Sequence, residues 1–141
     1  LGGLLHDIGK IGIPDAILQK PTKLNEDEWK IVYTHPALGA ELISPIKKLA
    51  NVSPMIESSH ERYDGLGYPH GRKGEEIPLG ARIVSVVDSY SAMLDKRPYK
   101  EPYSIDKIIM ELELYSGKMY DPSVVKAFLN IIRAEHNDST L

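Results

Sequence analysis

The longest helical pattern in the sequence is Pro78-Leu79-Gly80-Ala81-Arg82-Ile83-Val84-Ser85-Val86-Val87-Asp88-Ser89-Tyr90-Ser91-Ala92-Met93-Leu94-Asp95. Its apolar side chains recur at the spacing of the buried face of an amphipathic helix. They are Leu79, Ile83, Val86, Val87, Tyr90 and Leu94. Helical spacing continues on both sides of this stretch, and no segment alternates apolar and polar residues as a half-buried strand would. The sequence therefore predicts an all-α fold, a compact bundle of several helices.

Local start and stop signals divide the rest of the chain into shorter helices. Asn25 followed by Glu28 is a capping box, so a helix is expected to begin there and to bend or restart at His35-Pro36. Its larger buried side chains are expected to be Trp29, Val32 and Tyr33. Other helices are expected over residues 1–9, 53–61, 104–115 and from 121 onward, with one turn at 14–18 and a long loop over 64–78.

The composition is that of a single globular domain. The chain has 141 residues, of which 26% are charged, and it contains no cysteine. A disulfide framework and thiolate ligands are thereby excluded, so any metal must be bound by His, Asp or Glu. With no long apolar run and no secretory signal, we expect a cytoplasmic protein without direct membrane insertion. The net charge of -3 disfavours binding to a nucleic-acid polymer.

The first residues have the character of a helix interior. In Leu1-Gly2-Gly3-Leu4-Leu5-His6 the leucines lie at helical spacing, yet no capping residue precedes them. We therefore expect one domain over residues 1–141 that lacks its N-terminal helices.

A lone carboxylate interrupts the long helical pattern at Asp88. Its neighbours are largely apolar, and a buried carboxylate is costly unless it is paired, hydrogen-bonded or bound to a metal. A salt bridge with Arg82 or Lys10 is the competing explanation.

Three other positions also place ligand-type side chains at helix ends or breaks. Each has an ordinary alternative: a core histidine paired with aspartate for His6-Asp7, a capping residue for His35, and a solvated helix end for His60. Taken together, the candidate ligands are His6, Asp7, His35, His60 and Asp88. Five nitrogen and oxygen donors suit one or two ions such as Mn, Fe, Zn or Ni, and an aspartate can bridge two ions in phosphoryl hydrolysis. The remaining histidines, His70 and His136, are assigned to solvent.

Longer motifs carry far more information than these single residues. They are His6-Asp7-Ile8-Gly9-Lys10-Ile11-Gly12-Ile13-Pro14-Asp15, His35-Pro36, His60-Glu61-Arg62-Tyr63-Asp64-Gly65-Leu66-Gly67-Tyr68-Pro69, Ile77-Pro78-Leu79-Gly80-Ala81-Arg82-Ile83, Val87-Asp88 and Arg97-Pro98-Tyr99-Lys100. In this order and register they resemble the HD-GYP domain family, part of the HD superfamily, over nearly the whole chain.

The resemblance implies a helical phosphodiesterase that hydrolyses the bacterial second messenger cyclic di-GMP to linear pGpG and GMP. It implies a cluster of two or more divalent transition metal ions, most often Fe or Mn, held by His6, Asp7, His35, His60 and Asp88. Asp7 is the expected bridge, and Lys10 is expected near the scissile phosphate. The implied substrate-binding residues are Gly67, Tyr68, Pro69, Arg97 and Lys100. An aromatic face at Tyr68 can stack on guanine and Arg97 can hold a phosphate, although Tyr68 can also pack over its loop and Arg97 can cap a helix.

HD-GYP domains are usually output modules, so the resemblance implies an upstream sensory domain and contact with a diguanylate cyclase or another signalling protein. Two departures from the family pattern bear on activity. Ser59 stands where a second histidine usually precedes His60, and the upstream helices, which in the family contribute a further ligand or two to the metal cluster, are expected to be missing. A smaller change is Ser91, which stands where an aspartate is frequent. We therefore keep two alternatives: a catalytically degenerate module that binds nucleotide or a partner protein, and a phosphodiesterase for another nucleotide.

Overall fold

The computed structural model describes residues 1–96 and 101–138, and within them the chain is built from helices and loops. The helices are α1 (Gly2–Leu5), η1 (Ile8–Gly12), α2 (Asp15–Leu18), α3 (Glu26–Val32), α4 (His35–Ile43), α5 (Ser53–Glu57), η2 (Gly74–Glu76), α6 (Leu79–Leu94), α7 (Ile105–Leu114) and α8 (Pro122–Asp138). Pairing of the β type in this part of the chain is confined to an isolated bridge between Ser116 and Tyr120. The prediction of an all-α fold is confirmed.

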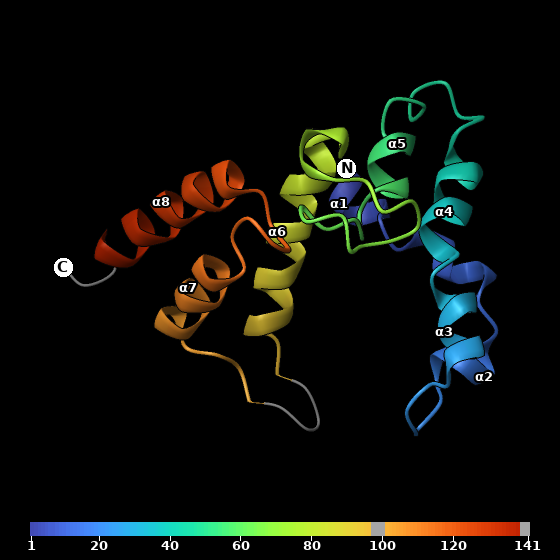
Figure 1. Ribbon diagram of the computed structural model, residues 1–141, viewed down its shortest axis with the longest axis horizontal. Helices are drawn as coiled ribbons and strands as arrows, with labels where there is room; N and C mark the ends of the chain where they lie inside the picture. Colours follow the sequence, from blue (N-terminus) through green and yellow to red (C-terminus); the bar gives the residue numbers. More distant parts are fainter. Residues whose placement is uncertain (97–100, 139–141) are drawn as a thin grey trace.

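Helix α6 separates two groups of helices (Figure 1). Helices α7 and α8 lie on one side of it, and α1 to α5 lie on the other. On the first side an apolar core forms around Val86, Ile108 and Leu112, all fully buried, and around apolar residues of α8. On the second side α4 packs against both η1 and α5.

The buried face of α6 differs from the predicted one. Val86 is buried as expected, but Ala81 is the other buried residue, whereas Leu79, Ile83 and Val87 are exposed. The reason is that α6 has helices on two sides. Val86 faces the core with α7 and α8, while the small residue Gly80 lies against the Met55 side chain of α5, where a Cβ would overlap the sulfur. The larger apolar side chains are left on the face between the two contacts.

Helix α3 begins at the predicted capping box. The Asn25 side chain accepts from the Glu28 N–H at 2.9 Å, and the Glu28 carboxylate accepts from the Asn25 N–H at 2.8 Å. Helix α4 then restarts at His35, with proline in its first turn, where it is tolerated. The predicted burial of Trp29 and Tyr33 is wrong, because α3 lies at the edge of the molecule and these rings are 43% and 41% exposed.

Helix α5 ends at Glu57, four residues before the predicted end at Glu61. The Ser59 hydroxyl donates to the Ile56 carbonyl at 2.8 Å, a local bond that competes with continued helix. Beyond it, the loop is attached to a distant segment: the N–H groups of Tyr63 and Asp64 donate to the carbonyls of Met119 and Lys118 at 3.2 and 2.8 Å. These bonds give the long loop a fixed course.

Gly9 brings η1 close enough to α4 to place Asp7 beside His35. A Cβ at position 9 would overlap the His35 carbonyl oxygen and the Gly39 nitrogen. The glycine in the motif is therefore required by this close approach. In the part of the chain that the structure describes, every helix is too short or too polar to traverse a bilayer.

Candidate metal centre

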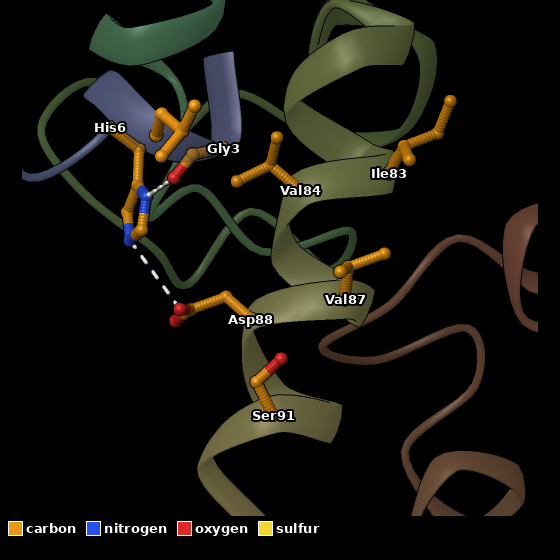
Figure 2. Close-up of a pocket in the computed structure, with 8 residues that line it drawn as sticks. Gly3, His6, Ile83, Val84, Val87, Asp88 and Ser91 are labelled. Carbon is orange, nitrogen blue, oxygen red and sulfur yellow. Dashed lines mark hydrogen bonds and ion pairs between the residues drawn. The ribbon is translucent and has the colours of Figure 1, made fainter. Parts of the chain in front are cut away.

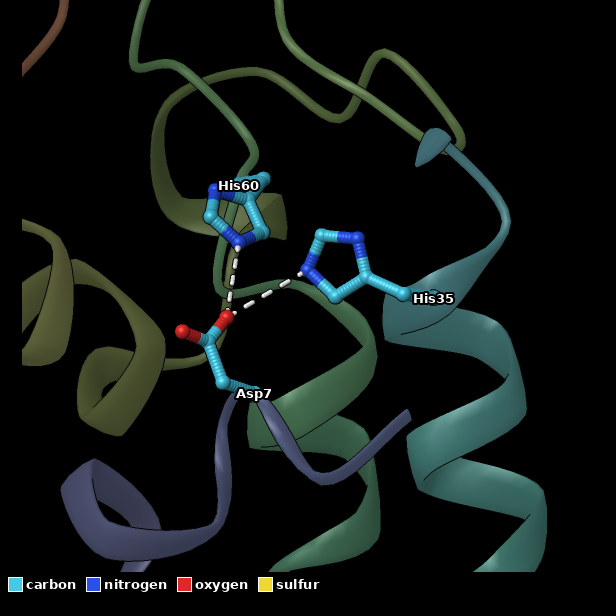
Figure 3. A group of neighbouring side chains, drawn as sticks. All are labelled: Asp7, His35 and His60. Carbon is cyan, nitrogen blue, oxygen red and sulfur yellow. Dashed lines mark ion pairs between the residues drawn. The ribbon is translucent and has the colours of Figure 1, made fainter. Parts of the chain in front are cut away.

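Asp7, which precedes η1, lies beside the rings of two histidines. Its Oδ1 lies 3.5 Å from His35 Nε2 and 3.9 Å from His60 Nε2 (Figure 3). One ligand atom from each of these three residues lies within 4.8 Å of the other two. The histidines come from the start of α4 and from the turn after α5, so three separate segments meet at one carboxylate oxygen.

The second oxygen of Asp7 faces a different set of groups. Its Oδ2 lies 3.6 Å from His6 Nε2 and 2.6 Å from the Lys10 ammonium. His6 Nε2 in turn lies 3.5 Å from Asp88 Oδ1, as Figure 2 shows. The structure thus places His35 and His60 at one oxygen of Asp7 and His6 beside the other, and Asp88 joins these residues through its contact with His6.

The donor atoms of the first set fit a metal ion. Asp7 Oδ1, His35 Nε2 and His60 Nε2 are all buried and have no hydrogen-bond partner. Buried polar atoms without partners are rare and costly, and a bound cation would satisfy all three at once. They are also the donor types that borderline transition metals prefer.

Backbone carbonyls fix the orientation of two rings. His35 Nδ1 lies 2.6 Å from the Val32 carbonyl oxygen, and His6 Nδ1 lies 2.7 Å from the Gly3 carbonyl oxygen. A carbonyl can only accept, so each Nδ1 carries a proton, and each Nε2 is the ring nitrogen that faces Asp7.

Electrostatics keep Asp7 ionised. The His35 and His60 rings, and after them the Lys10 ammonium, hold the pKa of Asp7 well below its ordinary range, although partial burial opposes this. A carboxylate that is charged at neutral pH is the form that binds cations.

Asp88 was selected as a candidate because it was expected to be buried, and the structure shows that it is not. Its side chain is 51% exposed, so the burial penalty does not apply. The alternative explanation, a salt bridge from Asp88 to Arg82 or Lys10, is wrong, because Arg82 pairs with Asp121 and Lys10 pairs with Asp7. What remains is its position opposite His6, at the rim of a hollow that also includes Ser91.

Tyr68 lies directly on the candidate centre. Its ring stacks on His60 with centroids 5.1 Å apart and planes 6° apart, and its centroid is 4.3 Å from that of Tyr33. Its N–H donates to the His60 carbonyl at 3.2 Å. Burial, and then the neighbouring Tyr33 and Asp7, raise the pKa of Tyr68 to about 12. The phenol therefore stays protonated at neutral pH and can donate a hydrogen bond.

The other predicted substrate residues divide into two groups. Gly67 packs against the backbone of Glu61 and Arg62, where a Cβ would overlap both, and Pro69 is half-buried beside it. Gly67 thus permits the turn that carries Tyr68 onto His60. Arg97 and Lys100 lie outside the described residues.

Sequence reasoning missed a polar group that attaches the loop to α5. His70 was assigned to solvent, and although it is exposed, its Nε2 lies 3.1 Å from Glu57 Oε1 and its N–H donates to Glu61 Oε1 at 2.8 Å. Arg72 also bonds Glu57, at 3.2 Å, and the buried Ser58 hydroxyl. No local sequence motif predicts these pairs, because they join residues far apart in sequence. His136 is exposed, as predicted.

Ser59 does not join the candidate centre. It is buried, and its hydroxyl bonds the Ile56 carbonyl within α5. The position where a further imidazole was expected therefore contributes a structural hydrogen bond instead.

A helical domain with histidines and aspartates converging on one point is the class that this fold and site define. The HD domain family model matches residues 1–124, and the chain belongs to that family. It is 47% identical over 131 residues to a cyclic di-GMP phosphodiesterase of Thermotoga maritima, an alignment that covers 90% of this chain and 35% of the relative. It is 48% identical over 127 residues to the cyclic di-GMP phosphodiesterase response regulator RpfG of Xanthomonas campestris pv. campestris, covering 89% and 34%. The resemblance to HD-GYP proteins is thus confirmed.

A solved structure supports the fold independently. The crystal structure of a cyclic GMP-AMP specific phosphodiesterase from V. cholerae superposes with a TM-score of 0.65 at 21% sequence identity, covering 92% of this chain and 36% of that one. The chain spans about a third of the length of the curated relatives that it matches, at 35% and 34%.

Proposed function

We propose that this domain is a metal-dependent phosphodiesterase that hydrolyses cyclic di-GMP. The observation that carries the proposal is the buried triplet of unpartnered donor atoms on Asp7, His35 and His60. The names of the relatives supply the substrate, because both of those described above are called cyclic di-GMP phosphodiesterases. Neither the shared fold nor the triplet alone would distinguish this substrate from another phosphodiester.

The proposed centre would hold two divalent ions, with Asp7 as a ligand of both. Asp7 Oδ1, His35 and His60 would hold one ion. Asp7 Oδ2 and His6, with the Asp88 carboxylate beside His6, would contribute to the second. Iron or manganese fits this mixture of imidazole and carboxylate best, and zinc or nickel is the next choice. When bound, such ions polarise the phosphate oxygens and lower the pKa of the attacking water.

The side chains of the chain itself orient and stabilise the phosphodiester. Lys10 is held 2.6 Å from Asp7 Oδ2, so its ammonium lies where it can offset negative charge that develops on a phosphate oxygen. The protonated Tyr68 phenol is a second donor beside the same centre. Water adds its oxygen to phosphorus, the bond to the ribose O3′ breaks, and that oxygen takes up the proton. Linear pGpG leaves, and a second hydrolysis yields GMP.

The test is a hydrolysis assay with purified, manganese- or iron-loaded protein, read by chromatography of the nucleotides. We expect cyclic di-GMP to be converted to pGpG and GMP. Cyclic GMP-AMP is the comparison substrate, because the V. cholerae phosphodiesterase of similar fold is specific for it. Hydrolysis of cyclic GMP-AMP alone would support the metal chemistry and overturn the substrate.

A second function, binding of the nucleotide without turnover, is favoured by Ser59. Its hydroxyl is committed to Ile56, so the centre has one imidazole fewer than the family pattern implies. Binding without hydrolysis across several metals would support this degenerate form. A gain of activity in Ser59→His would identify the missing imidazole as the defect.

The setting of the domain is part of the same proposal. We place it in the cytoplasm, as the output module of a longer signalling protein with a sensory domain upstream. A diguanylate cyclase is the proposed kind of partner, since it supplies the nucleotide that this domain would remove.

A further inference from the structure

A row of aromatic rings leads from the candidate metal centre to the outside of α3. Tyr68 stacks on His60 and contacts Tyr33, and Tyr33 stacks on Trp29 with centroids 5.6 Å apart and planes 29° apart. We call these four rings, His60, Tyr68, Tyr33 and Trp29, the aromatic row. Its inner end is a proposed metal ligand, and its outer end is solvent-exposed.

The exposure of the outer two rings is the informative feature. Trp29 and Tyr33 are four residues apart, the spacing at which side chains of one helix meet, which accounts for their contact with each other. Even with this contact, 43% of Trp29 and 41% of Tyr33 remain exposed, so both side chains are accessible from solvent. An exposed aromatic pair beside a binding site offers a surface on which a base can stack.

The charges around this pair favour a base over a phosphate. Lys20 is held by Glu28 at 2.7 Å, and Lys30 is held by Asp27 at 2.7 Å. Both ammonium groups are neutralised by their own neighbours, so recognition at this surface depends on the rings. Tyr68 is already stacked on His60 and in contact with Tyr33, which leaves the outer rings as the accessible part of the row.

We propose that Trp29 and Tyr33 form the stacking platform for one purine base of a cyclic dinucleotide whose phosphodiester lies at Asp7, His35 and His60. The proposal rests on the proposed function and deepens it by naming residues that position the substrate. Tyr33 is connected to His60 through Tyr68, by ring contacts with centroids 4.3 and 5.1 Å apart, so the platform lies next to the candidate metal centre. Neither Trp29 nor Tyr33 takes part in the chemistry; they fix where the nucleotide lies.

The chain contains its own probe for this contact, because Trp29 is its single tryptophan. Metal-loaded protein is titrated with the bis-phosphorothioate of cyclic di-GMP, which resists hydrolysis, while tryptophan emission is recorded. We expect saturable quenching of the emission. Tyr33→Leu, which keeps bulk and removes the π face, should weaken binding about 5- to 20-fold. Tyr33→Phe should retain nearly the wild-type affinity.

Steady-state hydrolysis of cyclic di-GMP provides the second readout. In Tyr33→Leu and Trp29→Leu we expect KM to rise by the same factor while kcat and metal content stay at the wild-type level. Tyr115→Leu, at the end of α7, is the matched control, because that tyrosine is exposed to a similar degree and lies outside the proposed site. It should change neither constant.

The outcomes separate this proposal from the proposed function. If the wild type hydrolyses cyclic di-GMP and both leucine variants keep the wild-type KM, the platform is wrong and the enzyme stands. If Tyr33→Leu loses metal, Tyr33 acts through Tyr68 and His60, which also overturns the platform. If metal-loaded wild type neither binds nor hydrolyses any cyclic dinucleotide, both proposals fail.

Discussion

Residues 1–78 and residues 79–138 each contain an aspartate with a buried carboxylate oxygen, and the two carboxylates differ in their hydrogen bonding. Asp121, at the start of α8, is buried, and its oxygens accept from the Ser123 N–H, the Ser123 hydroxyl and Arg82. Asp7, before η1, has one buried oxygen that faces two histidine nitrogens and accepts no hydrogen bond. The first carboxylate is satisfied by the fold, and the second is not.

The residues buried around these two aspartates also differ. Residues 79–138 are organised by an apolar core in which Val86, Ile108 and Leu112 have no exposed surface. Residues 1–78 consist of short helices, where apolar residues such as Ile43 and Ile56 are buried together with the polar groups of His35, Ser58, Ser59 and Glu61. Each unsatisfied buried polar atom costs about 1–3 kcal/mol, so a cluster of them is retained where it serves a purpose. The buried polar groups are thus concentrated in the part of the chain that supplies four of the five candidate ligands, and α6 supplies the fifth, Asp88.

The largest effect is expected at Asp7. Asp7→Asn keeps the size of the side chain and removes the charge that both metal positions share. We expect bound metal to fall sharply and hydrolysis to drop by at least about 10³-fold, since electrostatic stabilisation of the transition state depends on it. Elemental analysis and the nucleotide assay measure the two effects. Asp106→Asn, an exposed aspartate at the start of α7, is the control, and equal metal content in both variants would refute the assignment.

A substitution in the apolar core is expected to affect stability and to leave metal binding unchanged. Leu112→Ala should lower the free energy of unfolding by about 2–5 kcal/mol, because it leaves a cavity at a fully buried position. Urea denaturation measures this loss. Leu114→Ala, on the exposed side of the same helix, should change stability by less than about 0.5 kcal/mol. If folded Leu112→Ala protein binds metal less tightly, the two parts are coupled and the division drawn above is too sharp.

Lys10 tests whether a group at the centre can act on the chemistry without holding the metal. Lys10→Met keeps the length of the side chain and removes the ammonium. We expect kcat to fall about 10²-fold while metal content is retained, as for the loss of one group that stabilises transition-state charge. Loss of metal together with activity would mean that the pairing with Asp7 is what matters.

The smallest effect is expected at Asp121. Asp121→Asn retains an N-cap but leaves Arg82 without its charged partner, so unfolding should become easier by about 1–3 kcal/mol. Burial raises the pKa of Asp121, but bonds from Ser123 and Arg82 outweigh it, and the net pKa lies below the ordinary value of 3.8.

The lowered pKa of Asp121 determines how the stability difference between the wild type and Asp121→Asn depends on pH. A carboxyl with a lowered folded pKa stabilises the protein at pH values above the unfolded pKa, and this contribution is lost as the pH falls through the folded pKa. The stability difference between wild type and Asp121→Asn should therefore be constant near neutral pH and shrink below about pH 4. A difference that grows on acidification would contradict the role assigned to Asp121.

The sequence predicted these two parts with unequal success, for physical reasons. Helices α7 and α8 begin at the predicted residues, because Ser104 and Asp121 cap them through local bonds. The five candidate ligands were identified from their side-chain types, their positions at helix ends or in an apolar run, and then their motifs, and spacing alone could not have established that they meet. Burial was misjudged at Trp29, Tyr33 and much of the α6 face, since periodicity identifies an apolar face and not what covers it. The bonds from His70 and Arg72 to Glu57 were missed because they depend on tertiary contact.

The central claim is that Asp7 is shared by two metal ions. Anomalous X-ray diffraction from crystals of the protein grown with manganese tests it most directly. The account predicts one peak between Asp7 Oδ1, His35 Nε2 and His60 Nε2, and a second between Asp7 Oδ2, His6 Nε2 and Asp88 Oδ1. Manganese bound elsewhere, with no peak at Asp7, would contradict it.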